Sequence, residues 1–143
     1  MSSIKITTKT EIEDCVCELS VEIEFTDIFR QLAKTTVHSY KEITDKGVYI
    51  IAGYKLGLEK CKEIVVANPD IEKVSFEEVY MEEIFEDIDR NIFPISVFEV
   101  INAKLLWEIL GFARYGYELG LKHYLGIYKE NKKTWNIFVK GGR

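Results

Sequence analysis

Residues 53–58 read GYKLGL and residues 116–121 read GYELGL, so the two segments share five of their six letters. In each segment the glycines are four residues apart and would lie on one face of a helix. A glycine inside a helix costs about 1 kcal/mol relative to alanine, so some contact should offset that cost. Small residues with this spacing let helices approach closely in membranes. By analogy, the spacing predicts two helix-crossing surfaces, which are candidates to cross each other.

A ligand site is the alternative interpretation of the same two segments. Phosphate-binding loops continue with Lys-Ser or Lys-Thr, or place G-x-G-x-x-G after a strand, and neither pattern occurs here. The corresponding hypothesis is an enzyme that binds a small ligand or nucleotide between the two helices. Its candidate ligand-binding residues are Tyr54, Arg114, Tyr117 and Glu118. We identify no catalytic residue and expect no cofactor.

The length of the chain fits one domain over residues 1–143, and its composition, with 47% hydrophobic residues, allows a sizeable apolar core. The net charge is −5, which argues against a general nucleic-acid binder. No apolar stretch is long enough for a signal peptide or a membrane span. Three cysteines without framework spacing are typical of a reducing compartment, so we expect a cytoplasmic location.

Apolar and polar residues alternate along residues 15–25, which indicates a strand with one buried face. That face would hold Cys15, Cys17, Leu19, Val21, Ile23 and Phe25. A shorter alternation at residues 4–6 indicates a second strand, and the polar residues 9–14 would form the turn. The N-terminus is therefore predicted to be an antiparallel hairpin with one face on the core.

Apolar residues with helical spacing predict helices over 26–43, with Thr26 as the N-cap, and over 48–66. The sequence TDKG at 44–47 separates these helices, and Pro69 ends the second. Residues 48–53 could instead form a buried strand, but the helical spacing continues beyond them. Two capping boxes, from Ser75 and from Ser96, predict an acidic helix over 76–89 and a long helix over 97–129.

The last predicted helix would be about 50 Å long, which exceeds the diameter of a compact domain of this size. Its charged residues Lys104, Glu108, Glu118 and Lys122 form one narrow stripe. Such a helix either bends near residues 111–116 or projects into a partner, for example in a homo-oligomer. Residues 134–140 alternate again and predict a strand. The expected fold is α+β, with an N-terminal hairpin and a C-terminal strand packed on about four α-helices.

The acidic helix over 76–89 is the main candidate for partner binding. It carries seven acidic residues, and the partner-binding set would be Glu78, Glu82, Glu83, Glu86 and Asp87. Such a surface attracts a basic partner. The alternatives are an ordinary solvated helix face and a carboxylate Mg²⁺ site, but a Mg²⁺ site normally needs acids from a second helix, and none is found. No metal site is therefore assigned.

Histidines and cysteines give no further site, because no zinc-binding spacing joins His38 or His123 to the cysteines. From Phe112 onward seven basic and two acidic residues follow, opposite in charge to residues 70–89. These two regions could pair within one chain or between chains. The sequence thus favours a non-enzymatic intracellular interaction protein that regulates or inhibits a macromolecular partner, and a purely structural homo-oligomer is a further alternative.

Overall fold

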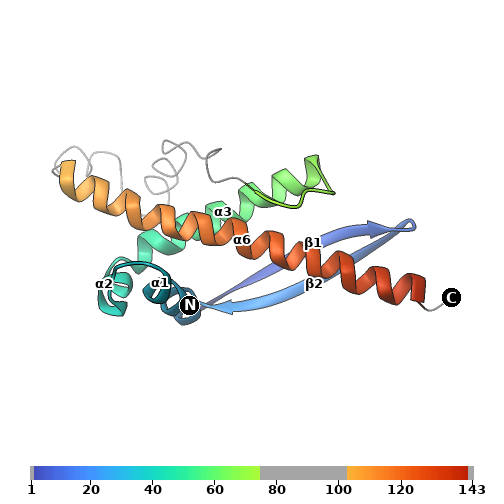
Figure 1. Cartoon of the computed structure of the whole chain (residues 1–143), viewed down its shortest axis with the longest axis horizontal. Helices are drawn as coiled ribbons and strands as arrows, with labels where there is room; N and C mark the ends of the chain where they lie inside the picture. Colours follow the sequence, from blue (N-terminus) through green and yellow to red (C-terminus); the bar gives the residue numbers. More distant parts are fainter. Residues whose placement is uncertain (1, 75–102, 142–143) are drawn as a thin grey trace.

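The computed structural model describes residues 2–74 and 103–141. Strands β1 (Ser3–Ile12) and β2 (Cys15–Glu24) are followed by helices α1 (Phe25–Thr35), α2 (Tyr40–Asp45), α3 (Gly47–Ala67) and α6 (Ala103–Gly141). Figure 1 shows α6 running along the whole length of the molecule, with β1, α3 and α6 directed toward the same end. The α+β class, the N-terminal hairpin and the long last helix are confirmed. The predicted helices over 76–89 and the start of the one over 97–129 lie outside the described residues.

The hairpin is longer than predicted, because its turn is only Glu13 and Asp14. Both residues have positive φ, 51° and 67°, as a two-residue hairpin turn of type I′ requires. The residues from Lys9 to Ile12 therefore belong to β1 and not to the turn. In β2 the predicted alternation is confirmed from Cys17 onward, but Cys15 is exposed beside the turn.

Helices α3 and α6 cross at the two glycine pairs. A Cβ built on Gly53 would overlap the carbonyl oxygen of Ala113, and one on Gly116 would overlap that of Ile50. The second pair repeats this geometry, with Gly57 against Tyr117 and Gly120 against Tyr54. Each glycine thus packs on the residue that lies three positions before the corresponding glycine of the other helix. Because the contacts are the same in both directions and run in the same order along both helices, α3 and α6 cross in parallel with approximate twofold symmetry. The prediction that the two segments are helix-crossing surfaces is confirmed, and they cross each other.

The glycine contact can be tested with two substitutions in one helix. Gly120→Ala places a methyl group against backbone, which we expect to destabilise the fold by about 1–3 kcal/mol. Gly126 is exposed, and nothing lies within 4 Å of its built Cβ, so Gly126→Ala should stabilise by up to about 1 kcal/mol. Urea unfolding of both variants measures the difference. Equal stability of Gly120→Ala and the wild type would contradict the backbone contact.

Helix α6 is unbroken over 39 residues, about 58 Å, and does not end near residues 111–116. Its middle is buried within the chain, because α3, β1 and β2 all contact it. Of its predicted charged stripe, Lys104, Glu108 and Lys122 are exposed and Glu118 is half-buried. Packing within one chain therefore accounts for the apolar residues in the middle of α6, and homo-oligomerisation stays a prediction.

The predicted C-terminal strand at residues 134–140 is wrong, because α6 continues to Gly141. Extending an existing helix adds a hydrogen bond for each residue fixed, whereas an isolated strand has no neighbour to pair with. The ring of Trp135 is half-buried and donates from Nε1 to the carbonyl oxygen of Glu18, 3.3 Å away. Ile137 and Phe138 remain exposed at 66% and 70%.

The predicted single helix over 26–43 is divided into α1 and α2. Helix α1 begins at Phe25 without a side-chain cap, so Thr26 is not the N-cap. Helix α2 opens with a capping box between Ser39 and Glu42, a signal that the sequence analysis missed. Val37, which the predicted helix over 26–43 would include, lies between α1 and α2 and is 95% exposed. The predicted break at 44–47, the helical state of 48–53 and the end of α3 before Pro69 are confirmed.

One buried polar side chain fixes the far half of α6 on the hairpin. Asn131 is fully buried, and its Nδ2 donates to Thr8 O at 3.1 Å, Thr8 Oγ1 at 3.0 Å and Cys17 O at 3.2 Å. Thr8 and Thr10 belong to the buried face of β1, together with Ile6 and Ile12. A buried amide bound to both strands sets the position of α6 along the hairpin.

Candidate functional site

Among the residues that the structure describes, strand β1 pairs along one edge only, and we call its other edge the free edge. The sheet within residues 2–74 and 103–141 contains only β1 and β2, which pair with Ser3 opposite Glu24 and Thr7 opposite Ser20. The amide of Phe25 donates to Ser2 O at 2.8 Å, which continues this register by one hydrogen-bonded pair. Because such pairs alternate in antiparallel strands, the even-numbered residues of β1 bind β2. The odd-numbered residues therefore direct their backbone N–H and C=O groups toward the free edge.

A groove lies between this free edge and helix α3. It consists of two adjoining cavities of ≈ 390 Å³ and ≈ 910 Å³, which share Thr7, Lys62 and Tyr124 as lining residues. One wall is β1 from Ile4 to Glu11, and the other is α3 from Lys55 together with the following turn to Asp70. We call this the β1–α3 groove. Its base is apolar and is made of buried side chains: Leu58, Val65, Tyr124 and Tyr128.

The rim of the groove carries more positive than negative charge. Its lining includes five lysines and three acids: Lys5, Lys9, Lys55, Lys62, Lys132, Glu11, Glu59 and Asp70. Lys9 binds Glu18 at 3.3 Å and Lys132 binds Asp70 at 3.1 Å. The other three lysines have no ion pair in the part of the chain that the structure describes. Among the described residues, the groove therefore offers three lysines without an ion pair above an apolar base.

Two tyrosines of α6, Tyr124 and Tyr128, lie at the base of the groove. Burial raises the pKa of Tyr124 to about 12, so its hydroxyl keeps its proton. The hydroxyl of Tyr128 donates to Pro69 O at 2.9 Å and holds the turn after α3 against α6. The groove is thus closed at this end by a fixed loop.

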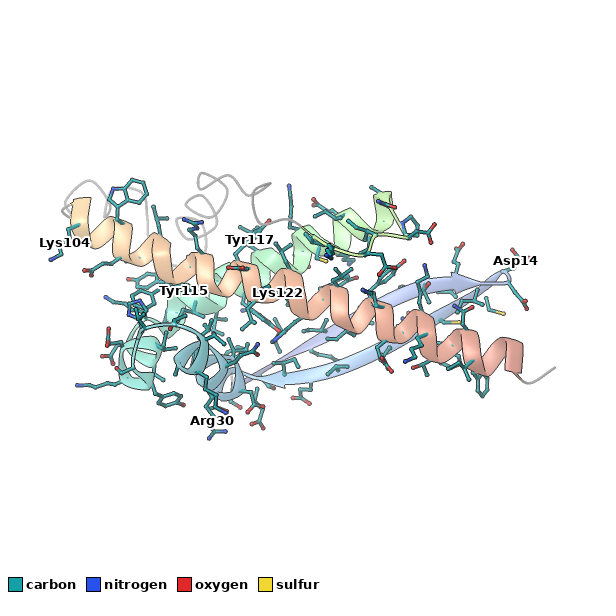
Figure 2. The ribbon with its side chains drawn as sticks, viewed as in Figure 1. Asp14, Arg30, Lys104, Tyr115, Tyr117 and Lys122 are labelled. Carbon is teal, nitrogen blue, oxygen red and sulfur yellow. The ribbon has the colours of Figure 1, made fainter. Side chains whose placement is uncertain are left out.

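The residues predicted for a small-ligand site are divided between the helix interface and the outer surface. Tyr54 and Tyr117 are completely buried where α3 and α6 cross. Arg114 is exposed, and Glu118 is half-buried and binds Lys122 at 3.3 Å. Figure 2 shows Tyr117 and Lys122 on neighbouring turns of α6. The backbone contact at the glycines fills the space that a ligand between the helices would need, so a site among these four residues stays a prediction.

Tyr54 instead belongs to a chain of hydrogen bonds that joins three helices. Its hydroxyl lies 2.6 Å from Nδ1 of His123, whose Nε2 lies 3.2 Å from Oε1 of Gln31. Since an amide oxygen only accepts, Nε2 carries the proton and Nδ1 accepts from Tyr54. Burial raises the pKa of Tyr54 and lowers the pKa of His123 below its usual 6.5, so both groups are neutral. No local pattern predicts this contact, because its members lie 69 and 92 residues apart.

The His123 contact makes stability depend on pH. Because the folded-state pKa of His123 is depressed, the unfolded chain binds its proton more tightly. Stability should therefore be fully present above about pH 6.5 and fall as the pH drops toward the folded-state pKa. Urea midpoints between about pH 7.5 and 5 should decrease more steeply for the wild type than for His123→Gln. Parallel curves for the two proteins would rule out this role of His123.

The remaining histidine and the cysteines do not assemble a reactive centre. His38 binds Glu42 at 3.1 Å and packs on Phe112, with ring centroids 4.7 Å apart. Cys61 is buried, and burial raises the pKa of its thiol to about 11, so it is protonated at neutral pH. Within the two described ranges, no three side chains of His, Cys, Asp or Glu form a metal-binding group.

The predicted partner-binding acids lie outside the described residues, as do Ser75 and Ser96 of the two capping boxes. Just before them, two acids of the same acidic region pair with the basic end of α6. Asp70 binds Lys132 at 3.1 Å, and Glu72 binds Lys129 at 2.9 Å. The Lys129 contact lowers the pKa of Glu72. The predicted pairing of the two oppositely charged regions thus occurs within one chain at these residues.

The chain matches no protein-family model, and no match was found among curated proteins or solved structures. Among its described helices, none combines the length and the apolar character that crossing a membrane requires. Its function has to be inferred from its own residues and their geometry.

Proposed function

We propose that this protein is a non-enzymatic intracellular interaction protein that binds an extended segment of a protein partner. The segment would add to the sheet as a third strand beside β1, a known mode of peptide recognition. The observation that supports this most directly is the free edge of β1 together with the β1–α3 groove beside it. Backbone hydrogen bonds would supply affinity, and the groove would accept alternate side chains.

The dimensions of the groove suit a single strand. Its β1 wall runs from Ile4 to Glu11, about 26 Å at 3.3 Å per residue, which fits a segment of about seven or eight residues. The larger cavity alone has a volume of ≈ 910 Å³, within the range of pockets that enclose ligands. Exposed sheet edges are usually short, twisted or covered, because they otherwise recruit other strands. A ten-residue strand with an open edge and an adjoining groove fits a binding role.

Strand addition can be tested with a matched pair of proline substitutions. Thr7 and Ser20 face each other, and their hydroxyls lie 2.8 Å apart, so either substitution removes the same side-chain contact. Each also removes a backbone N–H that points away from the partner strand, but only Thr7 lines the groove. Peptides selected from a random display library against the wild type should bind Thr7→Pro at least about tenfold more weakly and Ser20→Pro unchanged. Equal binding to all three proteins, at similar melting temperatures, would exclude the free edge of β1.

The acidic residues Glu78, Glu82, Glu83, Glu86 and Asp87 form a second proposed contact, for a basic region of a protein partner. Residues 70–89 contain nine acids and one lysine, and only Asp70 and Glu72 have ion pairs that the structure describes. A regulator or inhibitor of a basic protein would use such a surface for electrostatic attraction.

Charge reversal tests this second contact separately. The triple variant Glu82→Lys, Glu83→Lys, Glu86→Lys should no longer retain a basic partner captured from native cell extract by the wild type. Binding of the wild type should also weaken as salt rises, because exposed charges are screened. Unchanged capture by the triple variant would exclude the acidic surface, whereas Thr7→Pro reports only on the groove.

A further inference from the structure

We infer that the β1–α3 groove selects an extended segment in which apolar and acidic residues alternate. This inference rests on the proposed function, since it concerns the chemistry of the segment that would add to β1. It follows from what lies on the two sides of a strand placed beside β1. One side would face the core, and the other would face the lysine-rich rim.

Every second side chain of an added strand would point into the groove. In β1 the even-numbered residues face α6, and Ile4 and Ile6 line the groove from that side. Below the free edge lie Leu58, Val65, Tyr124 and Tyr128, which are 4–8% exposed. An ionised side chain placed on these groups would lose its hydration without a partner. The inward positions of the segment should therefore be apolar.

The other side chains would lie at the rim between two sets of lysines. Lys5 and Lys9 stand on the outer face of β1, and Lys55 and Lys62 stand on the opposite wall formed by α3. Lys5, Lys55 and Lys62 have no ion pair among the residues that the structure describes. Glu11 and Glu59 offset only part of this charge. Acidic residues at the outward positions would complete ion pairs with lysines from both walls.

The opposite edge of β1 already binds a strand of this kind. Strand β2 places Cys17, Leu19, Val21 and Ile23 toward the core and Glu18, Glu22 and Glu24 outward. Lys9 binds Glu18 across the pair at 3.3 Å, and Lys5 stands opposite Glu22. Lys9 therefore pairs with an acid of a neighbouring strand within this chain, whereas Lys5 forms no ion pair with Glu22, whose Oε1 accepts from Ser3 Oγ at 2.6 Å. On the free edge the same lysines would oppose basic strands, which makes the pairing selective.

Three labelled peptides of about eight residues test the inference, with valine alternating with glutamate, glutamine or lysine. By fluorescence anisotropy the glutamate peptide should bind the wild type about tenfold more tightly than the glutamine peptide, and the lysine peptide more weakly still. The double variant Lys5→Glu, Lys62→Glu should reverse this order. Lys34→Glu, Lys41→Glu changes the net charge equally at exposed residues outside the groove and should keep the wild-type order.

Amide hydrogen exchange locates the bound peptide. On binding, the amides of Lys5, Thr7 and Lys9 should become protected, while those of Ile6 and Thr8, which bind β2, should stay as they were. Equal affinity for the glutamate and glutamine peptides, with the same protection, would overturn the acidic preference and leave strand addition standing. If no peptide protects these three amides and library selection yields none that does, the proposed function fails as well. Faster exchange at Ile6 and Thr8 would show that the peptide replaces β2. Protection of the free edge in a dimer without peptide would show that a second copy of the chain occupies this edge. Either result overturns the inference.

Discussion

The backbone contact between α3 and α6 is the constraint on which the rest of this structure depends. At Gly53, Gly57, Gly116 and Gly120 no side chain separates the helices, so each glycine rests on a carbonyl oxygen of the other helix. Such contacts permit weak Cα–H···O hydrogen bonds and a large van der Waals area. They also fix how far each helix slides along the other, because a shift by one residue would bring a tyrosine or a leucine against the backbone.

The long α6 then serves as a common base for α3 and the hairpin, which barely touch each other. Its first half packs on α3, and its second half is held to the hairpin by Asn131 and Trp135. Because α3 and β1 both rest on α6 without a strand or helix of the described chain between them, a groove is left along β1. Tyr124 and Tyr128 of α6 form its base. The groove is therefore a consequence of how three elements share one helix.

Local patterns predicted the elements well where one signal dominates, and less well where two compete. The glycine spacing predicted the helix crossing, and period-two alternation predicted β2 with its buried face. The same alternation at residues 134–140 was misleading, because three alternate apolar residues also fit the end of a helix that is already formed. The two-residue turn at Glu13 and Asp14 was missed because it lacks the usual asparagine or glycine.

The candidate site depended on contacts that no local pattern encodes. The β1–α3 groove combines residues 4–11, 55–70 and 124–132, and each group alone resembles an ordinary amphipathic surface. Lys5 lies far in the sequence from Lys55 and Lys62 of α3, and the chain has a net charge of −5, so composition pointed away from a basic groove. Folding places them around one open strand edge. An edge of this kind recruits strands unselectively unless charge or shape restricts it. In the proposed complex the apolar base would restrict one side of an incoming strand and the lysines would restrict the other, so the same features would limit unselective pairing and define what the edge binds.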